Sequence, residues 1–148
     1  MLKLYTPMNT RNITLTLDKA KEWYNKGGEL KEIALQAFTE QELNPLPKSW
    51  EEYCKGYKVP TMIFGPCIPN KYVALWKLEK LRDCYRQGWK PDWELGYIDK
   101  YCITVLSNKL LISTRTVMAT FLSFQSREIA EEFLKNFEPL IKEAGDLI

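Results

Sequence analysis

Three cations and three aromatic residues near the middle of the chain have the spacing of a binding site. The cations lie four residues apart, so they share one side of a helix if that helix continues to residue 90. The aromatic residues follow in the stretch GWKPDWELGY. Cations beside an aromatic face can hold a phosphorylated ligand, because they pair with its oxygens while its base or sugar stacks on the ring. The candidate ligand-binding residues are Arg82, Arg86, Lys90, Trp89, Trp93 and Tyr97.

Both halves of this pattern also have a structural interpretation. In an extended chain the aromatic residues share one face with Pro91 and Leu95, so this arm can wrap onto a sheet and seal the core with its indoles. The basic stripe can be a solvated helix face, partly neutralised by Glu79 and Asp83. The sequence favours these interpretations, and leaves open an exposed indole that serves as a stacking platform.

The residue types available exclude several classes of catalytic site. The chain contains no histidine, which removes Ser-His and Cys-His pairs, His-ligated zinc and the commonest general base. Asp92, Glu94 and Asp99 carry oxygen ligands that suit Mg²⁺, yet three such acids are more typical of a solvated rim. There is no GxGxxG and no Gly-Lys dipeptide for a phosphate-binding loop. The sequence therefore predicts no catalytic residue, no metal and no cofactor.

Charge and hydropathy indicate where a partner can bind and in which compartment. The net charge of +2 is too small to predict a nucleic-acid or membrane partner from bulk electrostatic attraction. Residues 71–90 hold six basic and two acidic residues, so this segment is the best local attractor of anions. No apolar run approaches the ~20 residues of a membrane helix, and the first residues lack the apolar stretch of a secretory signal. We therefore expect a cytoplasmic protein with no membrane partner; its oligomeric state stays open.

The pattern of cysteines is also consistent with a cytoplasmic protein. They form no CxxC pair, and they are predicted to be reduced, mostly buried thiols. The four residues are Cys54, Cys67, Cys84 and Cys102.

Two long amphipathic helices are expected to carry most of the core. Apolar residues recur at helical spacing between residues 71 and 88, and Asn70 is expected to cap this helix. A second helix is expected to begin after Ser126 and to kink at Pro139, because proline lacks the N–H that the helix would use.

Shorter elements complete the predicted fold. ITLTL, residues 13–17, alternates like a strand, and Asp18 is the expected N-cap of a short helix that ends at Gly27. Two capping boxes, at Thr39 and Ser49, predict one-turn helices. A β-meander is expected over residues 93–124, with its first turn at residues 108–109. The prediction is an α+β fold in which a small antiparallel β-meander packs against two longer helices, with short N-terminal helices, in a single domain over residues 1–148.

Two long stretches resemble small uncharacterised proteins of Bacteroidales phages and prophages. They are LDKAKEWYNKGGELKEIALQAFTEQEL and the run from LEKLRDCYRQGWKPDW to FLSFQSREIAEEFLKNFEPLIKEAGDLI. The resemblance implies a phage or prophage origin in a gut bacterium and action in the host cytoplasm. It implies no catalytic residue.

Two functional hypotheses follow. The first is a non-catalytic phage accessory protein that acts by binding a host protein or a small anionic ligand. The alternative is a nucleic-acid-binding protein that uses the basic helix 71–90 and the adjacent Trp residues, with an affinity that falls steeply with salt.

Overall fold

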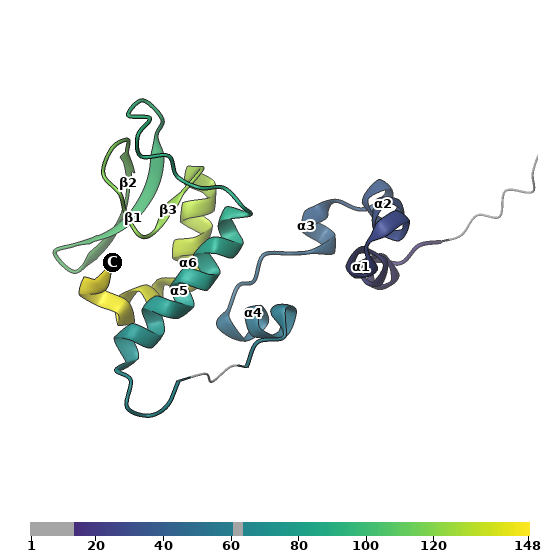
Figure 1. Cartoon of the computed structure of the whole chain (residues 1–148), viewed down its shortest axis with the longest axis horizontal. Coiled ribbons are helices and arrows are strands. Elements are labelled where there is room, and N and C mark those ends of the chain that lie inside the picture. Colours follow the sequence, from purple (N-terminus) through teal and green to yellow (C-terminus); the bar gives the residue numbers. More distant parts are fainter. Residues whose placement is uncertain (1–13, 61–63) are drawn as a thin grey trace, which may run out of the picture. The chain divides into compact units, whose positions relative to one another are not determined.

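The computed structural model describes residues 14–60 and 64–148 (Figure 1). Contacts between residues divide the chain into two compact units, residues 1–45 and 46–148. Each unit is described by itself below. The single domain over residues 1–148 stays a prediction.

The first unit consists of three short helices. They are α1 (Leu17–Lys26), α2 (Gly28–Ala37) and α3 (Glu40–Leu43). Gly27 separates α1 from α2 with a positive φ of 74°, a conformation that glycine adopts without a steric penalty. Buried Ala20, Ala34 and Leu43 form a small core of their own.

Local predictions for this unit were partly wrong. The predicted capping box is confirmed, since Thr39 Oγ1 accepts from the Glu42 N–H and Glu42 Oε2 accepts from the Thr39 N–H. The N-cap of α1 is Thr16 and not Asp18. Residues 14–16 are not a strand, and residue 13 lies outside the described residues. The Thr16 hydroxyl explains this difference, because it accepts from the Lys19 N–H and caps the helix. The helix therefore begins at Leu17, within the segment that was predicted to be a strand.

The second unit holds the longer helices. They are α4 (Trp50–Tyr57), α5 (Asn70–Arg86) and α6 (Arg127–Ala144), followed by the 3₁₀ turn η1 (Gly145–Leu147). The Ser126 cap is confirmed, because Ser126 Oγ accepts from the Ile129 N–H at 3.3 Å. The predicted kink is confirmed two residues before Pro139, where Phe137 leaves the helical conformation with φ −122° and ψ 15°. Helix α4 has about two turns, so it is longer than the one-turn helix predicted there.

Helix α5 is shorter than predicted at its C-terminal end. Its N-cap is Pro69 and not Asn70, and it ends at Arg86, after which Gln87 takes a left-handed φ of 48°. The chain therefore turns away before Lys90, which lies beyond the helix. This turn separates Lys90 from the helical stripe that its spacing predicted.

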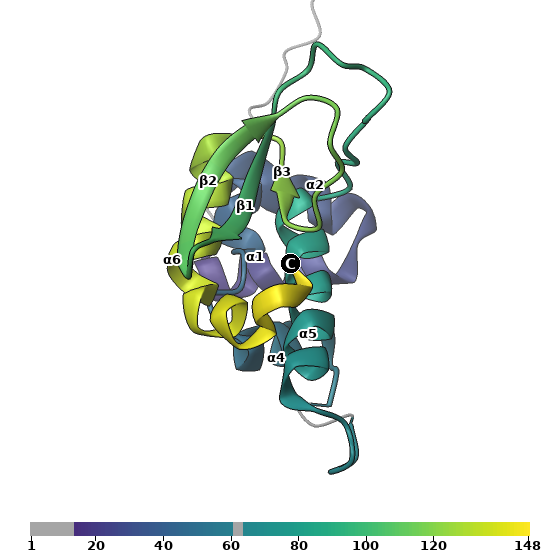
Figure 2. The same cartoon turned by 90° about the vertical axis from the view of Figure 1, so that its left-hand side faces the viewer.

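The sheet has three antiparallel strands, β1 (Lys100–Leu106), β2 (Lys109–Arg115) and β3 (Ser123–Phe124). Their order is β2-β1-β3, so β1 is central and β3 pairs with β1 instead of β2 (Figure 2). This order differs from that of the predicted meander, because residues 116–122 carry the chain back across the end of the hairpin before β3 forms. The Ile103 N–H donates to the Leu122 carbonyl at 2.9 Å and fixes this return.

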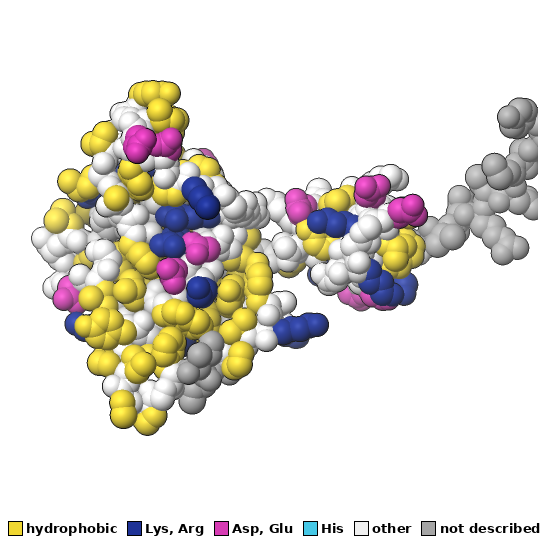
Figure 3. Space-filling view, in the orientation of Figure 1, with side chains coloured by type: hydrophobic (Ala, Val, Ile, Leu, Met, Phe, Trp, Pro, Cys, Tyr) yellow, Lys and Arg dark blue, Asp and Glu magenta, His cyan; other side chains and the backbone are white. Residues whose placement is uncertain are grey.

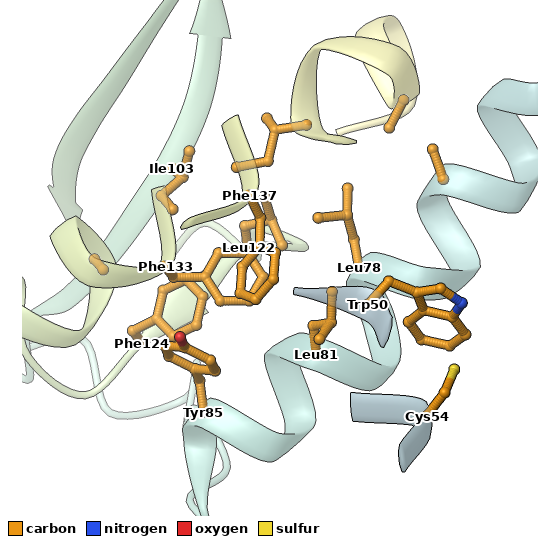
Figure 4. Close-up of a cluster of buried hydrophobic side chains, with 14 residues drawn as sticks. Trp50, Cys54, Leu78, Leu81, Tyr85, Ile103, Leu122, Phe124, Phe133 and Phe137 are labelled. Atoms are coloured by element: carbon orange, nitrogen blue, oxygen red, sulfur yellow. The ribbon is translucent and has the colours of Figure 1, made fainter. Parts of the chain in front are cut away.

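The core lies between one face of this sheet and the two long helices (Figure 4). Tyr85 of α5 meets Phe133 and Phe137 of α6 edge to face, with ring centroids 5.1 and 5.7 Å apart. Its hydroxyl donates to the Pro47 carbonyl and accepts from Asn136, each at 2.9 Å, so its polar end is satisfied inside the core. Full burial of a large apolar side chain stabilises a fold by about 1.5–3 kcal/mol. The α+β class is confirmed.

The β1–β2 turn gives a direct test of the strand register. Leu106 pairs with Lys109, so the turn is Ser107-Asn108, one residue earlier than predicted, with φ of 51° and 61°. Both positions are left-handed, as in a type I′ turn, which favours Asn-Gly. Replacing these residues by Asn and Gly together should raise the free energy of unfolding by about 1 kcal/mol in urea denaturation. As a control, Asn108→Val should lower it, and an unchanged value for both variants would contradict this turn.

Candidate functional site

The two arginines predicted on the helix donate to backbone carbonyls of the second unit. Arg82 Nη1 donates to the Phe121 carbonyl at 3.2 Å, and Arg86 Nε donates to the Ser123 carbonyl at 2.8 Å. Arg86 Nη2 also donates to Ser123 Oγ. These bonds join α5 to the segment that leads into β3. Arg82 and Arg86 are therefore anchors of the fold.

Burial and charge explain how these guanidinium groups behave. Arg82 pairs with Asp83 at 2.7 Å, and its side chain is 13% exposed. Arg86 has no such carboxylate contact among the described residues; burial, with the nearby Arg82 charge, lowers its pKa to about 10. A guanidinium group offers five donors and no acceptor, so carbonyl oxygens can satisfy it where a phosphate would otherwise bind. Little of this donor capacity is left for a ligand.

A fourth cation, which the sequence did not single out, is Lys100 at the start of β1. Lys100 is fully buried, and its Nζ donates to the Leu95 carbonyl at 3.1 Å and to the Thr116 carbonyl at 3.0 Å. The Trp93 ring centroid is 5.3 Å from this Nζ, within the range of a cation–π contact. Lys100 therefore joins the loop before β1 to the loop after β2. The sequence offered one signal for this burial: Lys100 lies two residues before Cys102 on β1, so the two side chains share a face of the strand. Both are fully buried in the structure.

The aromatic arm is not a strand, although its burial alternates as predicted as far as Leu95. Asp92 Oδ1 accepts from the backbone N–H groups of Glu94 and Leu95, which turns the chain. Trp89 and Trp93 are half-buried and lie outside the buried core cluster. Each indole covers a cation: Trp89 lies 5.7 Å from the Arg86 guanidinium, as Trp93 covers Lys100. The indoles therefore shield internal cations.

The structure also shows where Lys90, the candidate metal ligands and the cysteines lie. Lys90 is exposed. No group of three His, Cys, Asp or Glu side chains in the part of the chain that the structure describes could hold a metal ion. Cys54 and Cys102 are buried as expected, Cys84 is half-buried, and exposed Cys67 departs from the expectation because it lies in the loop before α5. Burial raises the pKa of the thiols of Cys54, Cys84 and Cys102, which keeps them protonated and weakly nucleophilic.

The two loops that Lys100 joins carry an exposed apolar surface, which we call the tip. The tip consists of Tyr97, Ile98, Val117 and Met118, of which Tyr97 is 79%, Val117 68% and Met118 60% exposed. Gly96 brings the loops together, since a Cβ there would lie 3.0 Å from Val117 Cγ1. Figure 3 shows hydrophobic and acidic side chains together at the end of the unit formed by the loop before β1.

Acidic residues accompany the tip in the loop before β1. Asp92, Glu94 and Asp99 are all exposed, and none of them pairs with a cation within residues 14–60 and 64–148. The three acids that resembled a magnesium site therefore lie in the same loop as Tyr97 and Ile98 of the tip. Of the six predicted site residues, Tyr97 alone belongs to the tip.

No family model, curated protein or solved structure matches this chain. Among the described residues no helix has both the length and the apolar character needed to cross a bilayer. The geometry of the chain is therefore the basis for a functional proposal.

The role of Lys100 can be tested by hydrogen exchange. Lys100→Met keeps the side-chain length and removes the ammonium group that joins the two loops. Amide exchange in residues 93–99 and 116–121 should become about tenfold faster or more, while the β1–β2 ladder stays protected. Lys109→Met, at an exposed position of the same hairpin, should leave both loops unchanged. Equal exchange in the two variants would contradict this role.

Proposed function

We propose that this chain is a non-catalytic phage or prophage accessory protein that acts in the cytoplasm of its bacterial host by binding a host protein through the tip. The phage origin and the host are expectations from the sequence resemblance. The observation that supports binding is the exposure of four large apolar side chains on loops that are tied together from within.

Exposure alone is common for single apolar residues, but the tip groups four of them on two adjoining loops. Rigid presentation favours affinity, because the loops lose little conformational entropy when a partner binds. The Lys100 bonds and the turn at Asp92 supply that rigidity. The acidic residues beside the tip favour a partner whose apolar recess is bordered by Lys or Arg.

A small anionic ligand receives less support than a protein. Arg82 and Arg86 already donate to backbone carbonyls, and Lys100 is fully buried. An anion would have to displace these internal bonds. Lys90 is the one predicted cation that remains exposed.

Photo-crosslinking in a gut Bacteroidales host tests the proposal. The full chain would carry p-benzoylphenylalanine in place of Tyr97, with a matched chain substituted at Leu106, which is 64% exposed at the opposite end of β1. A discrete protein adduct is expected from position 97 and not from position 106, and adding Val117→Ser should weaken it. Identical adduct patterns from both positions, or none from position 97, would refute a binding tip.

The nucleic-acid alternative has one observation in its favour. On α5, Lys80 Nζ lies 5.9 Å from the ring centroid of half-buried Trp76, which places an ammonium group beside an aromatic face. Lys77 Nζ lies 5.5 Å from the ring centroid of Trp50, but that ring is buried in the core. Such a surface would bind single strands with strong salt dependence. In the crosslinking experiment it predicts no discrete protein adduct that is specific to position 97.

A further inference from the structure

Strand β2 leaves one edge of the sheet open (Figure 2). It runs for seven residues, Lys109–Arg115, and pairs with β1 along its whole length on one side. An edge of this kind presents unpaired backbone groups to other chains unless charges, a bulge or a covering element protect it.

The hydrogen-bond pattern identifies the groups that face outward. The Ile103 N–H points to β3, because it donates to Leu122. Backbone groups alternate in direction along a strand, so Cys102 and Thr104 of β1 point to β2 and form its hydrogen-bonded pairs with Ser113 and Leu111. The residues between these pairs direct their N–H and C=O groups to the open edge. They are Leu110, Ile112 and Thr114.

No backbone bond joins these outward groups to another residue in the described ranges. Helix α6 covers the face that carries the side chains of Leu110 and Ile112, which pack on the core. On the other face Leu111 is 44% exposed. The edge is therefore open, and Leu111 offers apolar surface on the face that α6 does not cover.

Charge argues against a second copy of the chain as the occupant of this edge. In a symmetric antiparallel pair centred on Ile112, Lys109 of each copy would lie opposite Arg115 of the other. Like charges directly opposite each other are destabilising. The same two cations favour an incoming strand with an acidic residue at each end.

We propose that the β2 edge binds an extended, acid-ended segment of another protein, which adds to the sheet as an antiparallel fourth strand. Main-chain bonds to Leu110, Ile112 and Thr114 would supply the pairing. Acidic residues six positions apart would lie opposite Lys109 and Arg115, and an apolar residue would lie opposite Leu111. Arg115 Nη1 also donates to Met118 Sδ of the tip, so the two surfaces adjoin at this residue. The peptide test below does not depend on the proposed function.

Designed heptapeptides test the charge rule. The probe Glu-Thr-Ser-Val-Leu-Val-Glu places its ends opposite Arg115 and Lys109, and the control peptide has Lys at both ends. In an NMR titration of the full chain, the acidic peptide should bind about tenfold more tightly or better. Its binding should slow amide exchange at Leu110, Ile112 and Thr114. Equal affinity of the two peptides would overturn the proposal, and so would shifts confined to other surfaces.

Backbone substitutions test the pairing itself. Thr114→Pro removes an outward N–H at an exposed edge position, where proline is tolerated, and should abolish peptide binding. Thr114→Val keeps the N–H and should retain binding.

Modified peptides keep the test valid if Thr114→Pro fails to fold. N-methylation of the fourth residue of the acidic probe removes an N–H that would point to β2 and should abolish binding. N-methylation of the fifth residue affects an N–H that would point away and should be tolerated. Equal binding of the two methylated peptides would overturn the proposal.

Discussion

The second unit, which holds the sheet, depends on cationic side chains that donate to backbone carbonyls. The strand β3 is only two residues long, so its pairing with β1 contributes few backbone bonds. Arg86 adds bonds to both the carbonyl and the hydroxyl of Ser123 from α5. Lys100 similarly holds the two loops at the end of the hairpin. Charge-assisted bonds are stronger than neutral ones, which suits segments with little regular structure of their own.

The helices could be predicted from the sequence because their signals are local. The apolar stripe of α6, its Ser126 cap and its Pro139 kink lie within one segment, and each was confirmed. The end of α5 was misplaced by two residues, because no glycine or proline occupies position 87, where the chain turns left-handed at a glutamine. The strand order was not predictable, since two-residue β3 carries no alternation and its partner is set by bonds from another element.

The candidate site shows a related limit of sequence analysis. The spacing of Arg82 and Arg86 correctly placed both on one side of a helix, but spacing does not tell a ligand from the protein's own carbonyls as the acceptor. Trp89 and Trp93 proved to be covers over cations, an arrangement intermediate between core and open platform. With the central cations occupied, the surfaces that we propose for partners are the tip and the β2 edge. The loops that carry the tip are the segments that Lys100 joins.

The stability of two matched variants measures this central claim most directly. Arg86→Met removes the anchor to Ser123, and Lys90→Met removes an exposed cation of the same predicted stripe. If the guanidinium group is an internal anchor, Arg86→Met should lower the free energy of unfolding by about 2–4 kcal/mol, whereas Lys90→Met should change it by less than about 0.5 kcal/mol. Equally small effects for the two variants would contradict the account and return Arg86 to the candidates for ligand binding.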